Sequence, residues 1–176
     1  GLSTKYGETR VFNSPLAESS IIGTAVGLAT LGYKPVVEIQ FGDYIWTSMM
    51  QIRNEVTTLR YRSNDAWACP MVIRVPVGGY IHGSLCHSQS IDGYFAHMPG
   101  LIVCYPSTAE DAKGLLKSAC RSNNPVLFLE HKGLYRQRYA ASLEPNSNYL
   151  MPFGKARLVQ KGEDNRSLQF FDIHSL

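Results

Sequence analysis

The sequence predicts an α/β fold in which helices cover both faces of a parallel β-sheet, giving three layers. Short apolar runs, such as 71–75 and 126–129, alternate along the 176 residues with segments of helical period. Strands that are separated by helices form βαβ units, whose strands run parallel and need cover on both faces. The near-continuous apolar character of the runs agrees with this arrangement. The length is typical of one domain.

The first half of the chain contains the two longest predicted helices. Ser14 and Pro15 are typical of a helix start, as N-cap and first helical residue, and this helix should end at Gly32. Its many small residues predict a closely packed partner. The second helix is expected over 43–62, because its apolar residues recur at steps of three and four. The strands expected in this half are 10–12, 34–41 and 71–75.

The second half begins with a glycine-rich loop after the strand at 71–75. A capping box, Ser107-x-x-Glu110, should start a helix whose buried stripe reaches Ala119. From about residue 131 the pattern loosens, and 146–151 is interpreted as a linker. The remaining predicted elements are a short helix at 91–97 and strands at 101–105, 126–129 and 153–159.

Composition and missing motifs exclude several classes of function. Lys and Arg number 17 against 14 Asp and Glu, and the basic residues form no run, so we expect no nucleic acid partner. No apolar stretch approaches about 18 residues, so we expect no membrane span. The four cysteines lack C-x-x-C spacing, which favours free thiols and a cytoplasmic location. The dinucleotide, P-loop, hydrolase-elbow and H-E-x-x-H zinc motifs are missing.

Three groups of residues could carry chemistry. Glu18, in the first turn of the first helix, could either complement the helix dipole or bind a heterocyclic nitrogen. Gln40 and Tyr44 follow a predicted parallel strand, where ligands of α/β sheets bind, although ordinary packing also explains the aromatic ring. His82 and His87 lie in a loop dense in hydroxyl groups, where either proton transfer or simple loop hydrogen bonding could explain them.

At these residues the chain resembles the β subunit of thiamine-diphosphate-dependent 2-oxo acid dehydrogenases, the E1 component. The Q-F-x-D-Y and R-Y-R-S strings are most similar to the branched-chain enzyme, 2-oxoisovalerate dehydrogenase. The matching motifs stand in the family's order: Arg10–Glu18 (RVFNSPLAE), Glu38–Tyr44 (EIQFGDY), Arg60–Ser63 (RYRS), His87–Ser90 (HSQS), Phe95–Gly100 (FAHMPG) and Asp111–Leu116 (DAKGLL).

The resemblance implies a role for each candidate residue in a pyrimidine-binding, transketolase-like domain. Glu18 corresponds to the glutamate that binds N1′ of the cofactor's aminopyrimidine and so promotes loss of the thiazolium C2 proton. Leu16, Gln40 and Tyr44 correspond to its cofactor-binding neighbours. His87 corresponds to a catalytic histidine that faces the reactive centre, with His82 nearby in the substrate vicinity.

The resemblance also implies that the chain supplies half of a shared site. In the family, an α subunit or α half holds the diphosphate and Mg²⁺ through a G-D-G motif, which this chain lacks. A second β subunit and a lipoyl-bearing E2 complete the implied partners, and the substrate is a small 2-oxo acid. The small-residue helix 21–31 and the segment 41–46 are candidate subunit contacts. A structural K⁺ is implied near Met71, Val72, Ser122 and Asn124.

The match to the family is partial in length. We expect a pyrimidine-binding domain over 1–145, without the family's first strand and helix, and a linker with the truncated start of a C-terminal domain over 146–176. The implied activity is oxidative decarboxylation of branched-chain 2-oxo acids with acyl transfer to E2, in the cytoplasm or the mitochondrial matrix. The alternatives are a pyruvate or acetoin dehydrogenase β subunit and a noncatalytic interaction module. The fragment alone should be inactive.

Overall fold

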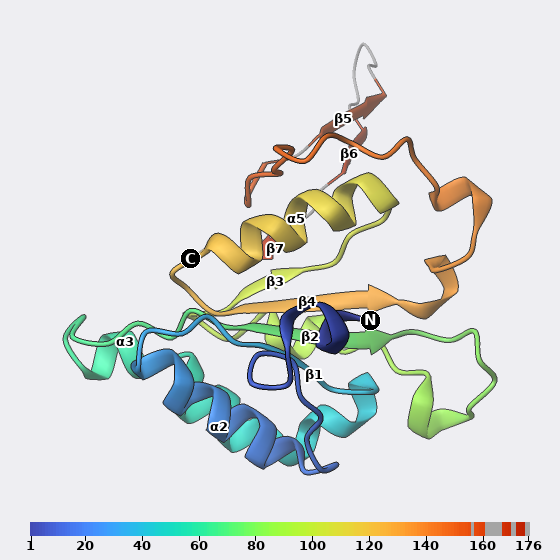
Figure 1. The fold of residues 1–176 in the computed structure, drawn as a ribbon. Helices are drawn as coiled ribbons and strands as arrows, with labels where there is room; N and C mark the ends of the chain where they lie inside the picture. Colours follow the sequence, from blue (N-terminus) through green and yellow to red (C-terminus); the bar gives the residue numbers. More distant parts are fainter. Residues whose placement is uncertain (156, 161–166, 170–171, 175–176) are drawn as a thin grey trace.

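A computed structural model describes residues 1–155, 157–160, 167–169 and 172–174, and it shows the predicted α/β architecture (Figure 1). Its main sheet has the strand order β1-β2-β4-β3-β7, in which the first four strands are parallel and β7 pairs antiparallel with β3. These strands are β1 (Val36–Glu38), β2 (Val72–Val77), β3 (Ile102–Cys104), β4 (Val126–His131) and β7 (Asp172–His174).

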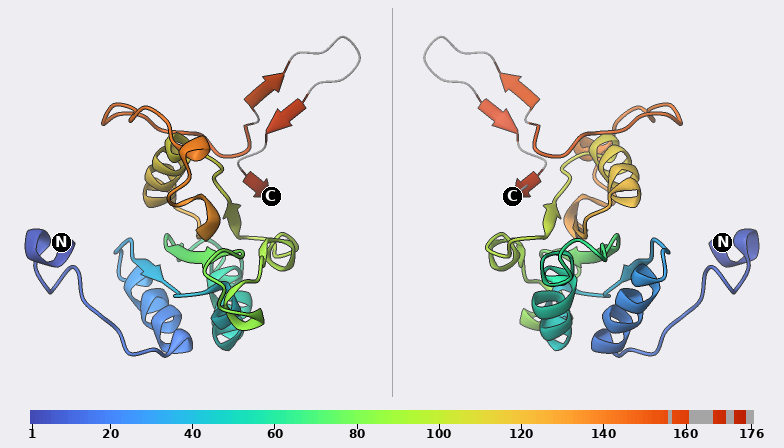
Figure 2. Two further views of the ribbon diagram at one scale, coloured as in Figure 1. Left: turned by 90° about the vertical axis from the view of Figure 1, so that its right-hand side faces the viewer. Right: turned by 90° about the vertical axis from the view of Figure 1, so that its left-hand side faces the viewer.

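Helices cover both faces of the sheet, which confirms the three layers (Figures 1 and 2). One face packs against α2 (Glu18–Thr30), η1 (Gly42–Ser48) and η2 (Gln51–Val56), and the other packs against α5 (Ala109–Arg121). Alternate residues of the parallel strands point to opposite faces, so β4 places Leu127 in one hydrophobic cluster and Phe128 in the other. The described helices outside these layers are α1 (Leu2–Tyr6), α3 (Leu59–Arg62), η3 (Leu85–His87), α4 (Asp92–Phe95), η4 (Lys132–Leu134) and η5 (Arg138–Ala140).

Three local predictions are wrong. Residues 10–12 form no strand, and α2 begins at Glu18 behind Ala17, so Ser14 is no N-cap: its hydroxyl donates to the carbonyl of Pro15 at 3.1 Å. The expected single helix over 43–62 is the succession of 3₁₀ helix η1, π-helix η2 and α3. Apolar steps of three and four have the period of an α-helix, so the pattern gave no sign of the 3₁₀ and π turns.

The helix α5 is capped one residue later than predicted. The hydroxyl of Thr108, and not that of Ser107, accepts from the backbone N–H of Asp111 at 3.2 Å. The segment that follows η5 then crosses the outer side of α5. Lys117 donates to the carbonyl of Tyr149 at 2.7 Å, and Ser118 donates to that of Met151 at 2.6 Å. The chain continues into β5 (Arg157–Gln160), which overlaps the second half of the strand expected at 153–159 and pairs with β6 (Ser167–Gln169).

No helix among the described residues is long and apolar enough to cross a membrane.

Candidate functional site

The carboxyl ends of three parallel strands bring most of the predicted site residues to one edge of the sheet. Gln40 follows β1 and leads into η1, the glycine-rich loop follows β2 and leads into η3, and Lys132 follows β4 directly. The amino end of α2 meets η1 at the same edge, where the two elements are in contact. Ligands of open α/β sheets bind at this edge because the loops there can diverge.

Glu18 is held in place by a side chain that sequence reasoning missed. It is the first residue of α2 and is half-buried, and its Oε2 accepts from the hydroxyl of Thr47 at 2.9 Å. The same hydroxyl lies 3.1 Å from the carbonyl oxygen of Tyr44. A second bond fastens the helix, because the hydroxyl of Ser19 donates to the carbonyl of Thr47. The carboxylate of Glu18 is therefore fixed against η1.

Tyr44 and His87 form a hydrogen-bonded pair next to this carboxylate. The phenol oxygen of Tyr44 lies 2.7 Å from Nε2 of His87, while Nδ1 of His87 lies 2.8 Å from the carbonyl oxygen of Gly83. A carbonyl can only accept, so Nδ1 carries a proton, and in the neutral imidazole Nε2 accepts from the phenol. This arrangement sets the tautomer of His87 and gives the site a group able to exchange protons.

Phe41 joins the pair from the end of β1. Its ring centroid lies 4.7 Å from that of His87, at an interplanar angle of 90°, and 5.5 Å from that of Tyr44. The neighbouring Gln40 is half-buried, and its Oε1 is buried without a hydrogen-bond partner among the described residues. An unsatisfied buried acceptor costs free energy, and a ligand N–H would relieve that cost.

The loop that carries His87 holds a strained backbone. Three residues other than glycine have positive φ: Tyr80 at 131°, His82 at 57° and Ser84 at 59°. Such conformations cost about 1–3 kcal/mol each and concentrate at functional sites. Gly78 begins the loop with a φ of 77°, and a Cβ there would lie 2.4 Å from Nε2 of His131, so only glycine fits.

Two predicted residues lie outside this group of contacts. Leu16 precedes α2, and 77% of its surface is exposed. His82 is also exposed, and among the described residues it takes no part in the hydrogen bonds that join Tyr44 to His87. The structure therefore brings together Glu18, Gln40, Tyr44 and His87 at one edge, whereas Leu16 and His82 are exposed and, among the described residues, join none of the hydrogen bonds of this group.

A separate cleft of about 600 Å³ lies on the opposite face of the sheet, beside α5. Its lining includes Arg74 and Glu130, which form a two-pronged ion pair with distances of 2.6 and 3.0 Å. Tyr135 donates to Glu130 at 2.7 Å, and burial together with this bond raises the pKa of its phenol. These three polar groups therefore satisfy one another within the cleft.

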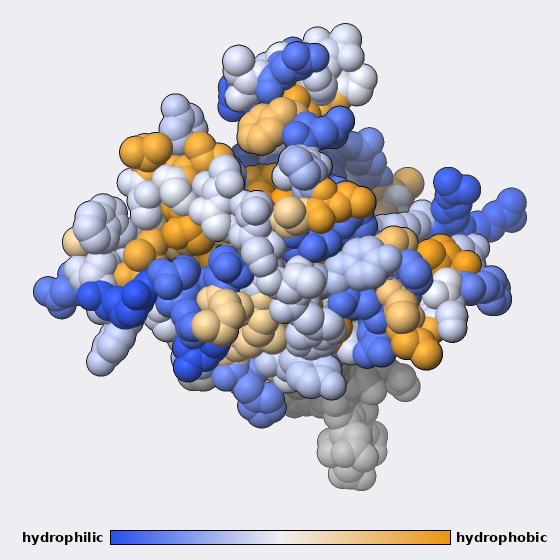
Figure 3. All heavy atoms as spheres, turned by 90° about the horizontal axis from the view of Figure 1, so that it is seen from below, coloured by the Kyte–Doolittle hydropathy of each residue, from blue (hydrophilic) through white to orange (hydrophobic). Residues whose placement is uncertain are grey.

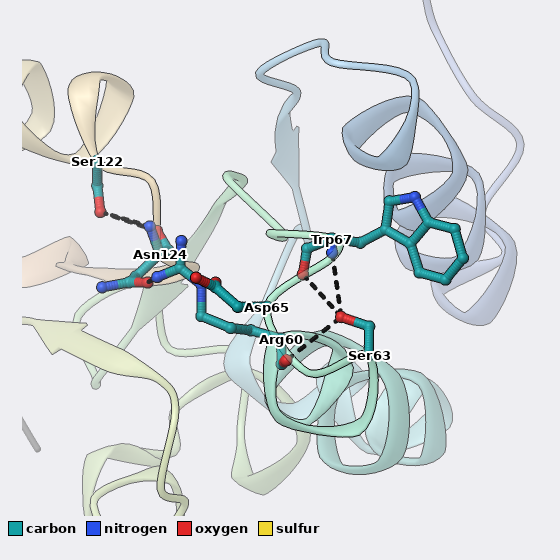
Figure 4. A network of polar contacts seen from close by, with 6 residues as sticks. All are labelled: Arg60, Ser63, Asp65, Trp67, Ser122 and Asn124. Carbon is teal, nitrogen blue, oxygen red and sulfur yellow. Dashed lines mark hydrogen bonds and ion pairs between the residues drawn. The ribbon is translucent and has the colours of Figure 1, made fainter.

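Protein side chains already form hydrogen bonds with the turn expected to hold K⁺ (Figure 4). The side-chain oxygen of Asn124 accepts from Arg60, which also pairs with Asp65 at 2.9 Å. The hydroxyl of Ser122 donates to the carbonyl of Asn124 at 3.0 Å and accepts from its N–H at 2.9 Å. Ser63 links the other end of this network to Trp67 through hydrogen bonds with its backbone.

A lysine ammonium already binds three further oxygens of this turn. Nζ of Lys34 donates to the carbonyls of Arg121 at 3.0 Å and Ser122 at 3.1 Å, and to the side chain of Asn123 at 3.2 Å. The carbonyl of Met71 accepts a backbone N–H of β4 at 2.9 Å. The donor set therefore does not fit a K⁺ ion. The described residues also contain no group of three His, Cys, Asp or Glu side chains that could hold a metal.

Sequence reasoning missed two polar residues of the site, and a signal existed for both. Thr47 stands three residues after Tyr44, which places the two on one face of an α-helix or a 3₁₀-helix. Lys132 stands directly after the strand β4, at the edge where ligands bind.

The comparisons with known proteins agree with this geometry. Residues 1–138 match the family model described as the transketolase, pyrimidine binding domain. This chain belongs to that family. The amino end of α2, the end of β1 and the loop after β2 all lie within the matched range, so the whole Glu18–Thr47–Tyr44–His87 group belongs to the family domain.

Several relatives are named as subunits of 2-oxo acid dehydrogenases. The 2-oxoisovalerate dehydrogenase subunit beta of Bacillus subtilis is 48% identical over 93% of this chain and 50% of its own length. The mitochondrial subunit of that name in Dictyostelium discoideum is also 48% identical, over 93% of this chain and 44% of its own. The pyruvate dehydrogenase E1 component subunit beta of B. subtilis is 44% identical over 93% of this chain and 50% of its own length. The chain thus spans about half the length of these relatives.

A solved structure supports the fold. The chain described as a split gene transketolase, inactive beta4 tetramer, matches with a TM-score of 0.66 at 21% identity, over 93% of this chain and 51% of its own. At this identity the match establishes the transketolase-like α/β fold alone.

Proposed function

We propose that this domain forms the pyrimidine-binding half of a thiamine diphosphate site in a 2-oxo acid dehydrogenase E1 β subunit. The observation that carries the proposal is the carboxylate of Glu18, held by Thr47 beside the Tyr44–His87 pair. Its supports are the family match and the relatives named as 2-oxoisovalerate dehydrogenase β subunits.

The residues present fit an aminopyrimidine. The half-buried carboxylate of Glu18 can hydrogen-bond a protonated ring nitrogen, and the unpartnered Oε1 of Gln40 can accept from an amino group. Tyr44 and Phe41 offer aromatic surface beside these acceptors. When bound, thiamine diphosphate supplies the carbon nucleophile and electron sink that decarboxylation requires. His87, oriented by Gly83, exchanges protons with the reacting groups.

A partner subunit completes the site. We infer that an α subunit, or an α half, holds the diphosphate and Mg²⁺, and that a second β subunit and a lipoyl-bearing E2 complete the assembly. The supporting observation is the outer side of α2, where nothing lies within 4 Å of a Cβ built on Gly23 or Gly27. Exposed Leu31, Met50 and Trp67 add apolar surface to the chain. Figure 3 shows the molecule from below, with hydrophobic patches among hydrophilic surface.

The substrate we favour is a branched-chain 2-oxo acid, because the 2-oxoisovalerate enzymes include relatives at 48% identity. The pyruvate dehydrogenase relative at 44% identity makes pyruvate the second candidate. Rates of decarboxylation with 2-oxoisovalerate and with pyruvate, measured on the enzyme reconstituted with its α partner, separate the two. We place the enzyme in the bacterial cytoplasm or in the mitochondrial matrix.

Exchange of the cofactor's C2 proton tests the role of Glu18 directly. In the reconstituted enzyme, Glu18→Gln should lower the rate of C2–H exchange of bound thiamine diphosphate by at least about 100-fold, because the amide cannot share a proton with the pyrimidine. Glu8→Gln is the matched control, since Glu8 is exposed and lies before α2. An unchanged exchange rate in the Glu18 variant would remove this residue from the proposed mechanism.

A further inference from the structure

Lys132 is a buried cation whose Nζ has no hydrogen-bond partner among the described residues, and neither the sequence motifs nor the proposed cofactor contacts use it. Only 5% of its surface is exposed, and its Nζ donates no hydrogen bond within the described part of the chain. Removing an ammonium from water costs several kcal/mol unless an anion compensates. Burial accordingly lowers the pKa of Lys132, and the nearby carboxylate of Asp43 opposes that shift.

The position of this lysine is fixed by its neighbour in the chain. His131 ends β4, and its Nδ1 accepts from the N–H of Gly133 at 3.0 Å, which starts η4. The ring of His131 stacks on Tyr105, with centroids 6.2 Å apart, and touches the backbone at Gly78. The backbone of Lys132 is thus held at the carboxyl edge of the sheet, between the ends of β2 and β3.

Lys132 shares an aromatic neighbour with the proposed catalytic histidine. Its Nζ lies 5.3 Å from the centroid of the Phe41 ring, within the range of a cation–π contact, and His87 meets the same ring edge-on at 4.7 Å. The nearby acid, Asp43, is already engaged, because its Oδ2 accepts from the N–H of Gln89 at 3.3 Å. The ammonium therefore lies on the ring that His87 also contacts, and no hydrogen bond to it is found among the described residues.

We propose that Lys132 binds the carboxylate of the 2-oxo acid. The substrate's charged end is then held at the carboxyl end of β4 while its oxo carbon faces His87. This inference rests on the proposed function. A substrate carboxylate is the anion that the buried ammonium lacks, and a charge-assisted bond to it is about twice as strong as a neutral one. The partner subunit would close the other side of the site and exclude water from the pair.

The test compares variants of the full-length β subunit reconstituted with its α partner. Lys132→Met and Lys132→Gln should raise KM for the 2-oxo acid about 10- to 100-fold, with kcat changing much less and the Kd of thiamine diphosphate unchanged. Lys132→Arg should recover much of the loss, because it restores the positive charge. Lys113→Met is the matched control. Lys113 is on α5, on the opposite face of the sheet, and is ion-paired with Glu144, so this variant should leave KM unchanged.

A pair of inhibitors that differ in charge separates substrate binding from a structural role. Wild-type enzyme should bind 3-methylbutanoate more tightly than 3-methylbutanamide, and Lys132→Met should abolish that preference. If the lysine served only to pair with Asp43, then Asp43→Asn would abolish the preference for the carboxylate just as Lys132→Met does. That result would show the proposal to be wrong. Unchanged KM in the Met and Gln variants, or failure of both to assemble, also overturns it. Wild-type enzyme inactive on every 2-oxo acid would instead refute the proposed function.

Discussion

Substitutions of Gly27 in α2 should not destabilise the isolated chain, but a bulky one should hinder assembly of the enzyme. Gly27 lies inside the helix with ordinary helical φ, it is exposed, and nothing lies within 4 Å of a Cβ built on it. Alanine in a helix interior is favoured over glycine by about 0.5–1 kcal/mol. Gly27→Ala should therefore raise the Tm of the isolated chain by about 1–4 °C, given the usual shift per kcal/mol for a domain of this size.

A bulky residue at the same place tests the proposed subunit contact. Gly27→Leu should leave the Tm of the isolated chain at or above the wild-type value, but it should prevent close approach of a partner helix. Thermal unfolding by circular dichroism measures the first effect, and sedimentation of the reconstituted subunits measures the second. A lower Tm for Gly27→Ala would show that the outer side of α2 is not open. Normal assembly of Gly27→Leu would show that no subunit packs there.

Three further results are expected. Gly78→Ala should lower the free energy of unfolding by at least about 2 kcal/mol in urea titrations, because φ is +77° and the new Cβ would lie 2.4 Å from His131. Lys34→Met should lower the free energy of unfolding by about 1 kcal/mol, because the lysine ammonium binds the turn after α5. For the same reason the wild-type chain should be equally stable in KCl and in NaCl, and a K⁺-specific gain in its stability would contradict this. Burial raises the pKa of the Cys69 thiol from 9.0 to about 11, so stability should fall as pH rises through that window, because only the unfolded thiol ionises there. A thiol reagent at pH 8 should modify the exposed Cys86 and spare Cys69 in the native chain.

The fold could be predicted because its signals are local. Parallel strands covered on both faces are apolar throughout, so the runs at 71–75 and 126–129 stand out in the sequence and became β2 and β4. The carboxyl-edge rule drew attention to Gln40 and Tyr44, and the structure joins Tyr44 to His87 by a hydrogen bond. The antiparallel addition of β7 to β3 is a non-local pairing, and 162–176 showed no period from which to infer it.

The parts that could not be predicted depend on tertiary contacts. The apolar residues from Ile45 to Leu59 recur as in an α-helix, but the backbone there forms 3₁₀ and π turns whose buried residues share one hydrophobic cluster with α2 and the sheet. The bond from Thr47 to Glu18 joins residues 29 positions apart. Lys34 reaches the turn after α5 across 87 residues, which no spacing rule could reveal.

The central claim is that this domain supplies half of a thiamine diphosphate site, and titration calorimetry tests it most directly. Thiamine diphosphate with Mg²⁺ should give no measurable binding heat with the isolated chain, because the diphosphate and Mg²⁺ are assigned to the α partner and only the pyrimidine to the Glu18 edge. The full-length subunit with its α partner should bind the cofactor, and Glu18→Gln should weaken that binding. Tight binding by the isolated chain, with a Kd in the micromolar range or below, would contradict the claim.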